Sequence, residues 1–252
     1  MKSYQLITLL SGAILLLSNV LLGLGVFDGH NVADGAFGNV LIGPAGYTFS
    51  IWGVIYLGLF AYSVYQCWPH EHEPRISKAA PYISINMLAN AAWLPAAAYE
   101  IIWLTLVLIA IMLYTLVMIN QIFVMRRIYV RWADRLLIKV TFSIYFAWVT
   151  IATALNVTVW LKSGLGWEGA PFSELTWGII ILFVAFFIVL LTFLKVANSY
   201  FAAVVIWAYM GIYMKTVDSI PQLAHVSGGL ALVMVLFILR RFMQRRHRLI
   251  FS

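Results

Sequence analysis

Eight long apolar segments, separated by short stretches that hold most of the charged residues, constrain this chain more than any other feature. The segments cover residues 4–26, 48–68, 80–97, 101–124, 136–161, 175–195, 199–215 and 222–239. About 20 apolar residues cross the hydrocarbon core of a bilayer as a helix, so each segment is predicted to be a transmembrane helix. The first is interpreted as an uncleaved helix, because its apolar core is too long for a signal peptide and no small-residue cleavage pattern follows it.

The composition excludes the main alternatives to an all-α, polytopic membrane protein. Hydrophobic residues make up 63% of the 252 residues and charged residues only 10%, too few to cover the surface of a soluble domain. Cys67 is the single cysteine, which excludes a disulfide scaffold. The net charge of +7 does not indicate a nucleic-acid partner, because the basic residues lie in short clusters between apolar segments.

The distribution of the basic residues predicts the orientation of the helices. With eight spans and a cytoplasmic N-terminus, fourteen of the 16 Lys and Arg residues fall on the cytoplasmic side, and only Lys162 and Lys215 fall outside. This asymmetry follows the positive-inside rule. We therefore expect a multi-pass protein with both termini in the cytoplasm, in a bacterial inner membrane.

Ionisable residues avoid the centres of the predicted spans, which argues against several functions. A proton- or sodium-coupled transporter needs such a group near the midplane, and a retinal pigment needs a buried lysine. No HExxH motif, paired carboxylates or histidine cluster lies within the spans, so no catalytic residue is predicted. His70 and His72 have no third ligand nearby and are interpreted as part of a solvated loop, so no metal ligand is predicted.

Aromatic and amide side chains recur at helical spacing in three of the predicted spans. The three stripes consist of Phe49, Trp52 and Tyr56, then Asn86, Asn90 and Trp93, then Tyr145, Trp148, Ala152 and Asn156. In one interpretation, the aromatic residues mark membrane interfaces and the amides join helices. Three stripes together favour a cavity with flat π faces and a few neutral hydrogen-bonding groups, which suits a large, planar, mostly apolar ligand.

Three motifs in order and in register resemble those of the translocator protein or tryptophan-rich sensory protein (TspO/MBR) family, over residues 1–162. GPAGYTFSIWGVIY (43–56) resembles that family's entry to its second helix, and NAAWLP (90–95) resembles its N-x-x-W-S-P motif. YFAWVTIATALN (145–156) is similar to its fifth-helix motif Y-x-x-W-x-x-F-A-T-A-L-N. Val157 replaces the Tyr of a cholesterol-recognition pattern in that family, so cholesterol is not predicted as a ligand.

The resemblance implies a five-helix bundle over residues 1–162 with a ligand pocket inside the membrane. Its pocket-lining positions would be Trp52, Asn86, Asn90, Trp148 and Ala152, with Phe49, Tyr56, Trp93 and Tyr145 around them. Family members bind porphyrins such as haem and protoporphyrin, so the resemblance implies a porphyrin-like ligand and no required cofactor. Residues 163–252 match none of these motifs, and we expect them to form a C-terminal extension: a three-helix accessory segment with a basic tail.

Three functions are compatible with these features. The leading interpretation is a membrane sensor or carrier, in contact with membrane lipids, that binds a planar hydrophobic ligand. The alternatives are an intramembrane enzyme acting on a tetrapyrrole or a lipid, and an assembly factor whose added helices dock a partner. The spans carry no GxxxG dimerisation face, and the sequence leaves a homodimer open.

Overall fold

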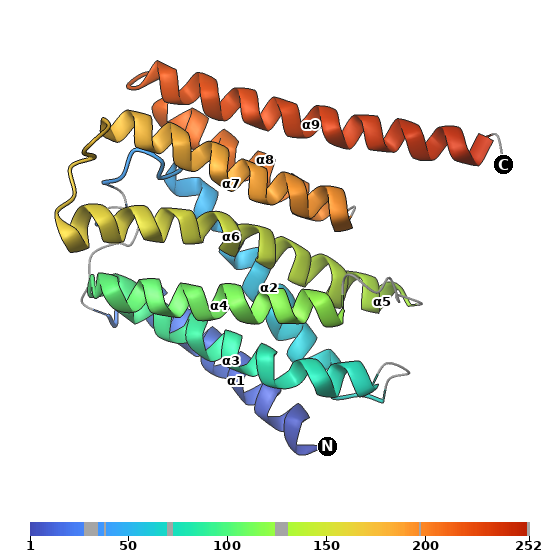
Figure 1. Ribbon diagram of the computed structural model, residues 1–252. Helices are drawn as coiled ribbons and strands as arrows, with labels where there is room; N and C mark the ends of the chain where they lie inside the picture. The colour runs from blue at the N-terminus through green and yellow to red at the C-terminus, as the bar shows by residue number, and fades with distance from the viewer. Residues whose placement is uncertain (28–34, 38, 70–72, 124–130, 197, 251–252) are drawn as a thin grey trace. The chain divides into compact units, whose positions relative to one another are not determined.

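The computed structural model describes residues 1–27, 35–37, 39–69, 73–123, 131–196 and 198–250 (Figure 1). Over these residues the regular structure is entirely helical, with eight long helices, which confirms the predicted fold class. The long helices are α1 (Ser3–Gly23), α2 (Ile51–Tyr65), α3 (Glu73–Ala98), α4 (Ile102–Ile122), α6 (Thr141–Val159), α7 (Glu174–Val196), α8 (Ser199–Thr216) and α9 (Pro221–Ile250).

Four shorter helical segments flank the long helices. The 3₁₀ segment η1 (Gly46–Ser50) leads into α2. A single turn, α5 (Trp132–Asp134), and a π-helical segment, η2 (Arg135–Val140), lead into α6, and a second π-helical segment, η3 (Trp160–Gly164), follows it. The helix α3 begins at Glu73 rather than at residue 80, and α9 ends at Ile250 rather than at residue 239. Hydropathy predicts only the apolar part of a helix, whereas the backbone hydrogen bonds continue into the polar turns at these ends.

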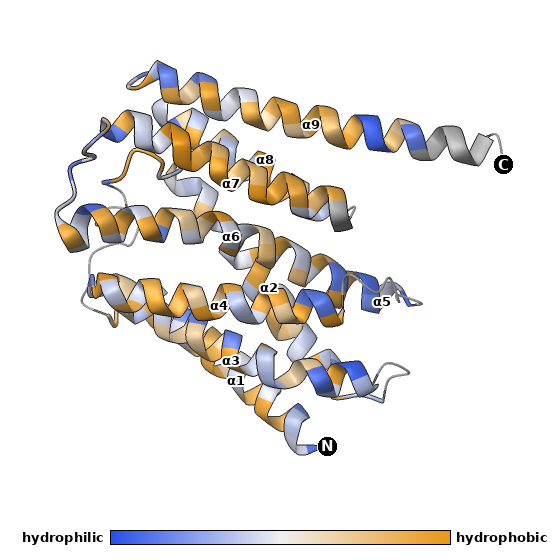
Figure 2. Ribbon diagram, in the orientation of Figure 1, coloured by the Kyte–Doolittle hydropathy of each residue, from blue (hydrophilic) through white to orange (hydrophobic). Residues whose placement is uncertain are grey.

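Within the part of the chain that the structure describes, six helical segments are long and apolar enough to cross a membrane. They are Ser3–Gly23, Gly46–Tyr65, Ile102–Ile122, Trp132–Gly164, Glu174–Leu194 and Pro221–Gln244. Figure 2 shows the apolar residues that run along these helices. The helices α3 and α8 form as expected but are not among the six; α3 carries the buried polar residues Ser84, Asn86 and Asn90, which lower its hydropathy. That α3 and α8 also cross the membrane stays a prediction.

The chain divides into two compact units. The first comprises residues 1–40 and 50–168, and the second comprises residues 41–49 together with the chain from residue 169 onward. Residues 41–49 join the later helices through specific contacts, because Ala45 N donates to Gly211 O at 3.0 Å and Trp207 Nε1 donates to Thr48 O at 2.9 Å. The boundary that the sequence predicts, at residues 162–163, lies close to residue 168, where the chain finally passes from the first unit to the second. The division of function between residues 1–162 and 163–252 stays a prediction.

In the first unit, five long helices form a closed ring. Contacts join α1 to α3, α3 to α4, α4 to α6, α6 to α2, and α2 back to α1. The stripes predicted on the second, third and fifth helices of the chain therefore lie on three members of one ring, namely α2, α3 and α6. This arrangement places the candidate site.

In the second unit, α7, α8 and α9 pack against one another. Tyr209 of α8 is fully buried, and its hydroxyl donates to the carbonyl of Leu182 in α7 at 2.6 Å. Inside a bilayer a tyrosine hydroxyl needs such a partner, because water is absent. A buried hydrogen bond thus joins α7 to α8 in addition to the packing of the three helices.

Glycine sets the distance between α2 and the start of α6. A Cβ atom at Gly58 would lie 2.7 Å from Thr141 Oγ1 and 2.8 Å from Thr141 Cγ2. Helices in a membrane associate through close packing rather than through exclusion of water, so small residues at the contact stabilise the pair. Gly53 lies on the same helix, but a Cβ there would meet no atom within 4 Å.

We expect Gly58→Ala to destabilise the first unit and Gly53→Ala to leave it intact. Both substitutions add about 1 kcal/mol of helix propensity, so their difference isolates the contact with Thr141. Overpacking costs about 1–3 kcal/mol, and Gly58→Ala should therefore give the lower melting temperature in detergent. Equal melting temperatures for the two variants would show that Gly58 does not set the spacing.

Candidate functional site

Four of the predicted site residues form one cluster of rings between α2 and α6. The ring of Trp52 stacks on Tyr56 with centroids 5.3 Å apart and an angle of 15° between the planes. It meets Tyr145 and Trp148 edge to face, with centroid distances of 6.0 and 6.1 Å. Trp52 is half-buried, and the other three rings are buried. The spacing of four residues along α2 and three along α6 brings these rings to one place.

Asn90 of α3 joins this cluster through both ends of its side-chain amide. The Tyr56 hydroxyl donates to Asn90 Oδ1 at 3.3 Å, and Asn90 Nδ2 donates to the Tyr145 hydroxyl at 2.7 Å. Asn90 is only 1% exposed, so these bonds are made away from solvent. One amide therefore links α2, α3 and α6 and holds two of the aromatic rings in fixed positions. We call Trp52, Tyr56, Asn90, Tyr145 and Trp148 the aromatic–amide cluster.

Trp93 lies on the same helix as Asn90 but has its own partners. Its Nε1 donates to Asn156 Oδ1 at 3.3 Å, which joins α3 to α6 a second time. Its ring meets Phe37 edge to face, with centroids 5.4 Å apart. Next to Phe37, the backbone N–H of Ala36 donates to Glu100 Oε1 at 2.9 Å, which holds this segment at the C-terminal end of α3. The sequence interpretation missed Phe37, because it lies between the predicted helices and no periodic pattern marks it.

Asn86 does not join the cluster. Its Nδ2 donates to Met112 O at 3.0 Å and to Thr115 Oγ1 at 2.8 Å, and both acceptors belong to α4. Four residues advance a helix by slightly more than one turn, and this difference turns Asn86 toward α4 while Asn90 points toward α2 and α6. Asn86 Oδ1 is buried without a hydrogen-bond partner among the described residues.

The remaining predicted positions are distributed as follows. Phe49 belongs to η1 and to the second unit. Ala152 is half-buried on α6, and its carbonyl accepts a hydrogen bond from Asn156 Nδ2 at 2.8 Å. His70 and His72 lie outside the described residues. Within the described residues, no group of three or more His, Cys, Asp or Glu side chains is placed to hold a metal ion.

The geometry of the tryptophan rings limits how a planar ligand could bind. The planes of Trp52 and Trp148 are 88° apart, so the two rings are not parallel walls. A flat ligand could stack on one ring and meet the edge of the other, which is a favoured arrangement of aromatic groups. A sandwich between the two rings would require one of them to rotate.

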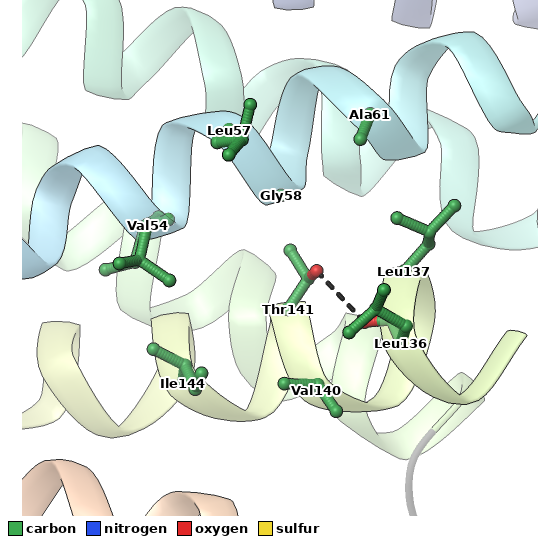
Figure 3. Close-up of a pocket in the computed structure, with 10 residues that line it drawn as sticks. Val54, Leu57, Gly58, Ala61, Leu136, Leu137, Val140, Thr141 and Ile144 are labelled. Atoms are coloured by element: carbon green, nitrogen blue, oxygen red, sulfur yellow. Dashed lines mark hydrogen bonds between the residues drawn. The ribbon is translucent and has the colours of Figure 1, made fainter. Parts of the chain in front are cut away.

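A separate cavity of about 290 Å³ lies between α2 and the η2–α6 helix (Figure 3). It is lined by Val54, Ile55, Leu57, Gly58, Ala61, Leu136, Leu137, Val140, Thr141 and Ile144. Thr141 is the one polar side chain among them, and its hydroxyl donates to Leu136 O at 3.3 Å. None of the residues predicted from the sequence lines this cavity. Three of its lining residues, Leu136, Leu137 and Val140, belong to the π-helical segment η2, which hydropathy and spacing do not reveal.

The helical fold and its six apolar spans define an integral, multi-pass membrane protein. The chain matches the family model of the TSPO-like protein over residues 5–240, and it belongs to this family. The match continues through residues 163–240, which the sequence motifs did not connect to the family. No curated protein and no solved structure matches the chain.

We expect Asn90→Leu to destabilise the protein more than the loss of a single polar contact would. Interhelical hydrogen bonds in membranes contribute about 0.6 kcal/mol on average and up to about 1.7 kcal/mol, and this substitution removes two. It also takes the acceptor Oδ1 from the buried Tyr56 hydroxyl and the donor Nδ2 from the buried Tyr145 hydroxyl. Combining it with Tyr56→Phe and Tyr145→Phe should therefore restore part of the lost stability. Melting temperatures in detergent measure both effects. A triple variant less stable than Asn90→Leu would contradict the role given to Asn90.

Proposed function

We propose that this protein is a membrane sensor or carrier that binds a planar, mostly apolar ligand of the porphyrin class at the aromatic–amide cluster. The observation that carries the proposal is the half-buried ring of Trp52, which contacts three buried rings that are themselves fixed by packing and by Asn90. Fixed aromatic faces bind a flat ligand without first losing side-chain freedom, which lowers the entropic cost of binding. Membership of the TSPO-like family supports a protein of this kind.

The chemistry of the cluster supports binding over catalysis. Its polar groups are two phenol hydroxyls, one amide and the indole N–H groups, all neutral near pH 7. General acid–base catalysis usually relies on a side chain that titrates near the working pH. The alternative of an intramembrane enzyme predicts a changed ligand after incubation, whereas a sensor or carrier returns it unchanged.

The proposal includes the orientation in the membrane. In the first unit, the N-terminus, the start of α3 and α5 lie at one end (Figure 1). These segments carry basic residues: Lys2, Arg75, Lys78, Arg131 and Arg135. Lys162 lies at the opposite end, where its Nζ donates to Asn39 O at 2.9 Å. Under the positive-inside rule, the first of these ends is cytoplasmic. The basic residues in the C-terminal half of α9, from Arg240 onward, lead us to propose by the same rule that the C-terminus is also cytoplasmic, with a bacterial inner membrane as the location.

Titration with protoporphyrin IX, followed by absorbance and tryptophan quenching, tests the site. We expect Trp52→Ala to weaken binding on the order of thirty-fold, because truncation of a central aromatic anchor costs about 2 kcal/mol. Trp103 is the matched control: it lies at the start of α4, outside the cluster, and is 62% exposed. Trp103→Ala should bind as the unaltered protein does. If Trp52→Ala melts at a lower temperature but binds with unchanged affinity, the rings only pack the bundle and the proposal fails.

The single native cysteine tests the orientation. Cys67 follows α2 and is partly exposed, at the end of the first unit that we assign to the cytoplasm. A membrane-impermeant maleimide should label it in inside-out vesicles and leave it unlabelled in right-side-out vesicles. A variant that combines Cys67→Ser with Glu168→Cys moves the thiol to an exposed position beyond η3 and should give the reverse pattern. The same pattern for both proteins would contradict the orientation.

A further inference from the structure

The cavity between α2 and the η2–α6 helix opens on the outer surface of the first unit. Among its lining residues, Val54 is 59% exposed, Leu57 is 70% exposed and Leu136 is 39% exposed. In a bilayer, an apolar surface of this kind on a membrane-spanning helix faces the acyl chains of lipids. The cavity is therefore a cleft that opens toward lipid, separate from the aromatic–amide cluster.

The shape of the cleft follows from a few local features. Gly58 and Ala61 present almost no side chain from α2, and the contact between Gly58 and Thr141 closes the base. Opposite them, the π-helical segment η2 widens the backbone, and such segments often mark functional positions in helices. The volume of about 290 Å³ lies just below the range for small-molecule pockets, which is about 300–1,000 Å³. It suits a single hydrocarbon chain better than a porphyrin.

One end of the cleft carries positive charge at the level of the membrane interface. Arg135 is exposed and directly precedes the lining residues Leu136 and Leu137, and Lys139 directly precedes Val140. The acidic residue beside Arg135, Asp134, is buried and accepts a hydrogen bond from the Tyr65 hydroxyl at 2.8 Å.

Two tryptophans locate the headgroup region at this end. Trp132 directly follows the basic residue Arg131 and is 75% exposed, and Trp68 follows α2 and is 59% exposed. Exposed tryptophans are typical of the boundary between hydrocarbon and headgroups. The basic side chains beside the cleft therefore lie where lipid phosphates lie, and the apolar lining continues from there into the membrane.

We propose that this cleft binds one acyl chain of an anionic phospholipid, with the lipid headgroup held by Arg135 and Lys139. From Ala61 to Val54 the cleft follows eight residues of α2, or about 10 Å along the helix, which accommodates the upper part of an extended chain. A lipid in this position would pack against Gly58 and Thr141 and fill the space between α2 and η2. The binding is independent of the porphyrin-class ligand proposed above.

Native mass spectrometry of the intact protein, released from nanodiscs with equal amounts of phosphatidylglycerol and phosphatidylcholine, tests the proposal. The unaltered protein should retain phosphatidylglycerol in preference to phosphatidylcholine. A basic residue near an anionic membrane surface contributes about 1 kcal/mol, so Arg135→Gln should lower the ratio of the two retained lipids about five-fold. Lys78→Gln removes an exposed charge from α3 at the same end of the unit and should leave the ratio unchanged.

A second variant tests the cleft itself. Ala61→Phe places a ring in the cavity and should reduce the retention of both lipids, whereas Leu10→Phe alters an exposed position on α1 and should not. Equal retention of both lipids by the unaltered protein would overturn the proposal. So would equal losses for Arg135→Gln and Lys78→Gln, which would show only a diffuse attraction to the membrane surface. A dimer that Ala61→Phe dissociates while the lipid ratio stays constant would assign the cleft to a second copy of the chain.

Discussion

A buried amide with no water around it must find its hydrogen-bond partners in the protein, and the candidate site depends on how Asn90 meets this requirement. Its oxygen accepts from Tyr56 and its nitrogen donates to Tyr145, so one side chain fixes rings on two other helices. Trp52 then stacks on Tyr56 and meets both Tyr145 and Trp148. An apolar side chain in place of Asn90 would remove the hydrogen bonds that join the Tyr56 and Tyr145 hydroxyls to α3.

Local patterns predicted the helices and most of the cluster. Hydropathy located all eight long helices, because each apolar segment must form its backbone hydrogen bonds internally. Helical spacing put Trp52 and Tyr56 on one face of α2, and Tyr145 and Trp148 on one face of α6. The family motifs had identified the same residues, and the match of the whole chain to the TSPO-like family is consistent with them.

What the sequence did not predict depends on contacts between distant residues. Asn86 and Asn90 lie one turn apart on α3, yet they contact different helices. Asn86 forms hydrogen bonds with α4, whereas Asn90 forms them with α2 and α6. Phe37 reaches Trp93 from a segment without periodicity. Residues 41–49 belong to the second unit and form hydrogen bonds with residues 207 and 211. No local sequence pattern predicts these long-range contacts. Part of the cleft between α2 and α6 is lined by the π-helical segment at residues 135–140, and hydropathy does not distinguish a π-helix from an α-helix.

The central claim is that a planar ligand binds at the aromatic–amide cluster, and locating the bound ligand tests it most directly. An experimental structure of the protein in nanodiscs with protoporphyrin IX would show the macrocycle relative to the rings. Our account predicts density for the macrocycle stacked on Trp52 or Trp148, with Asn90 still between the two tyrosine hydroxyls. Density at the lipid-facing cleft or on the outer surface, with the four rings still packed against one another, would contradict it.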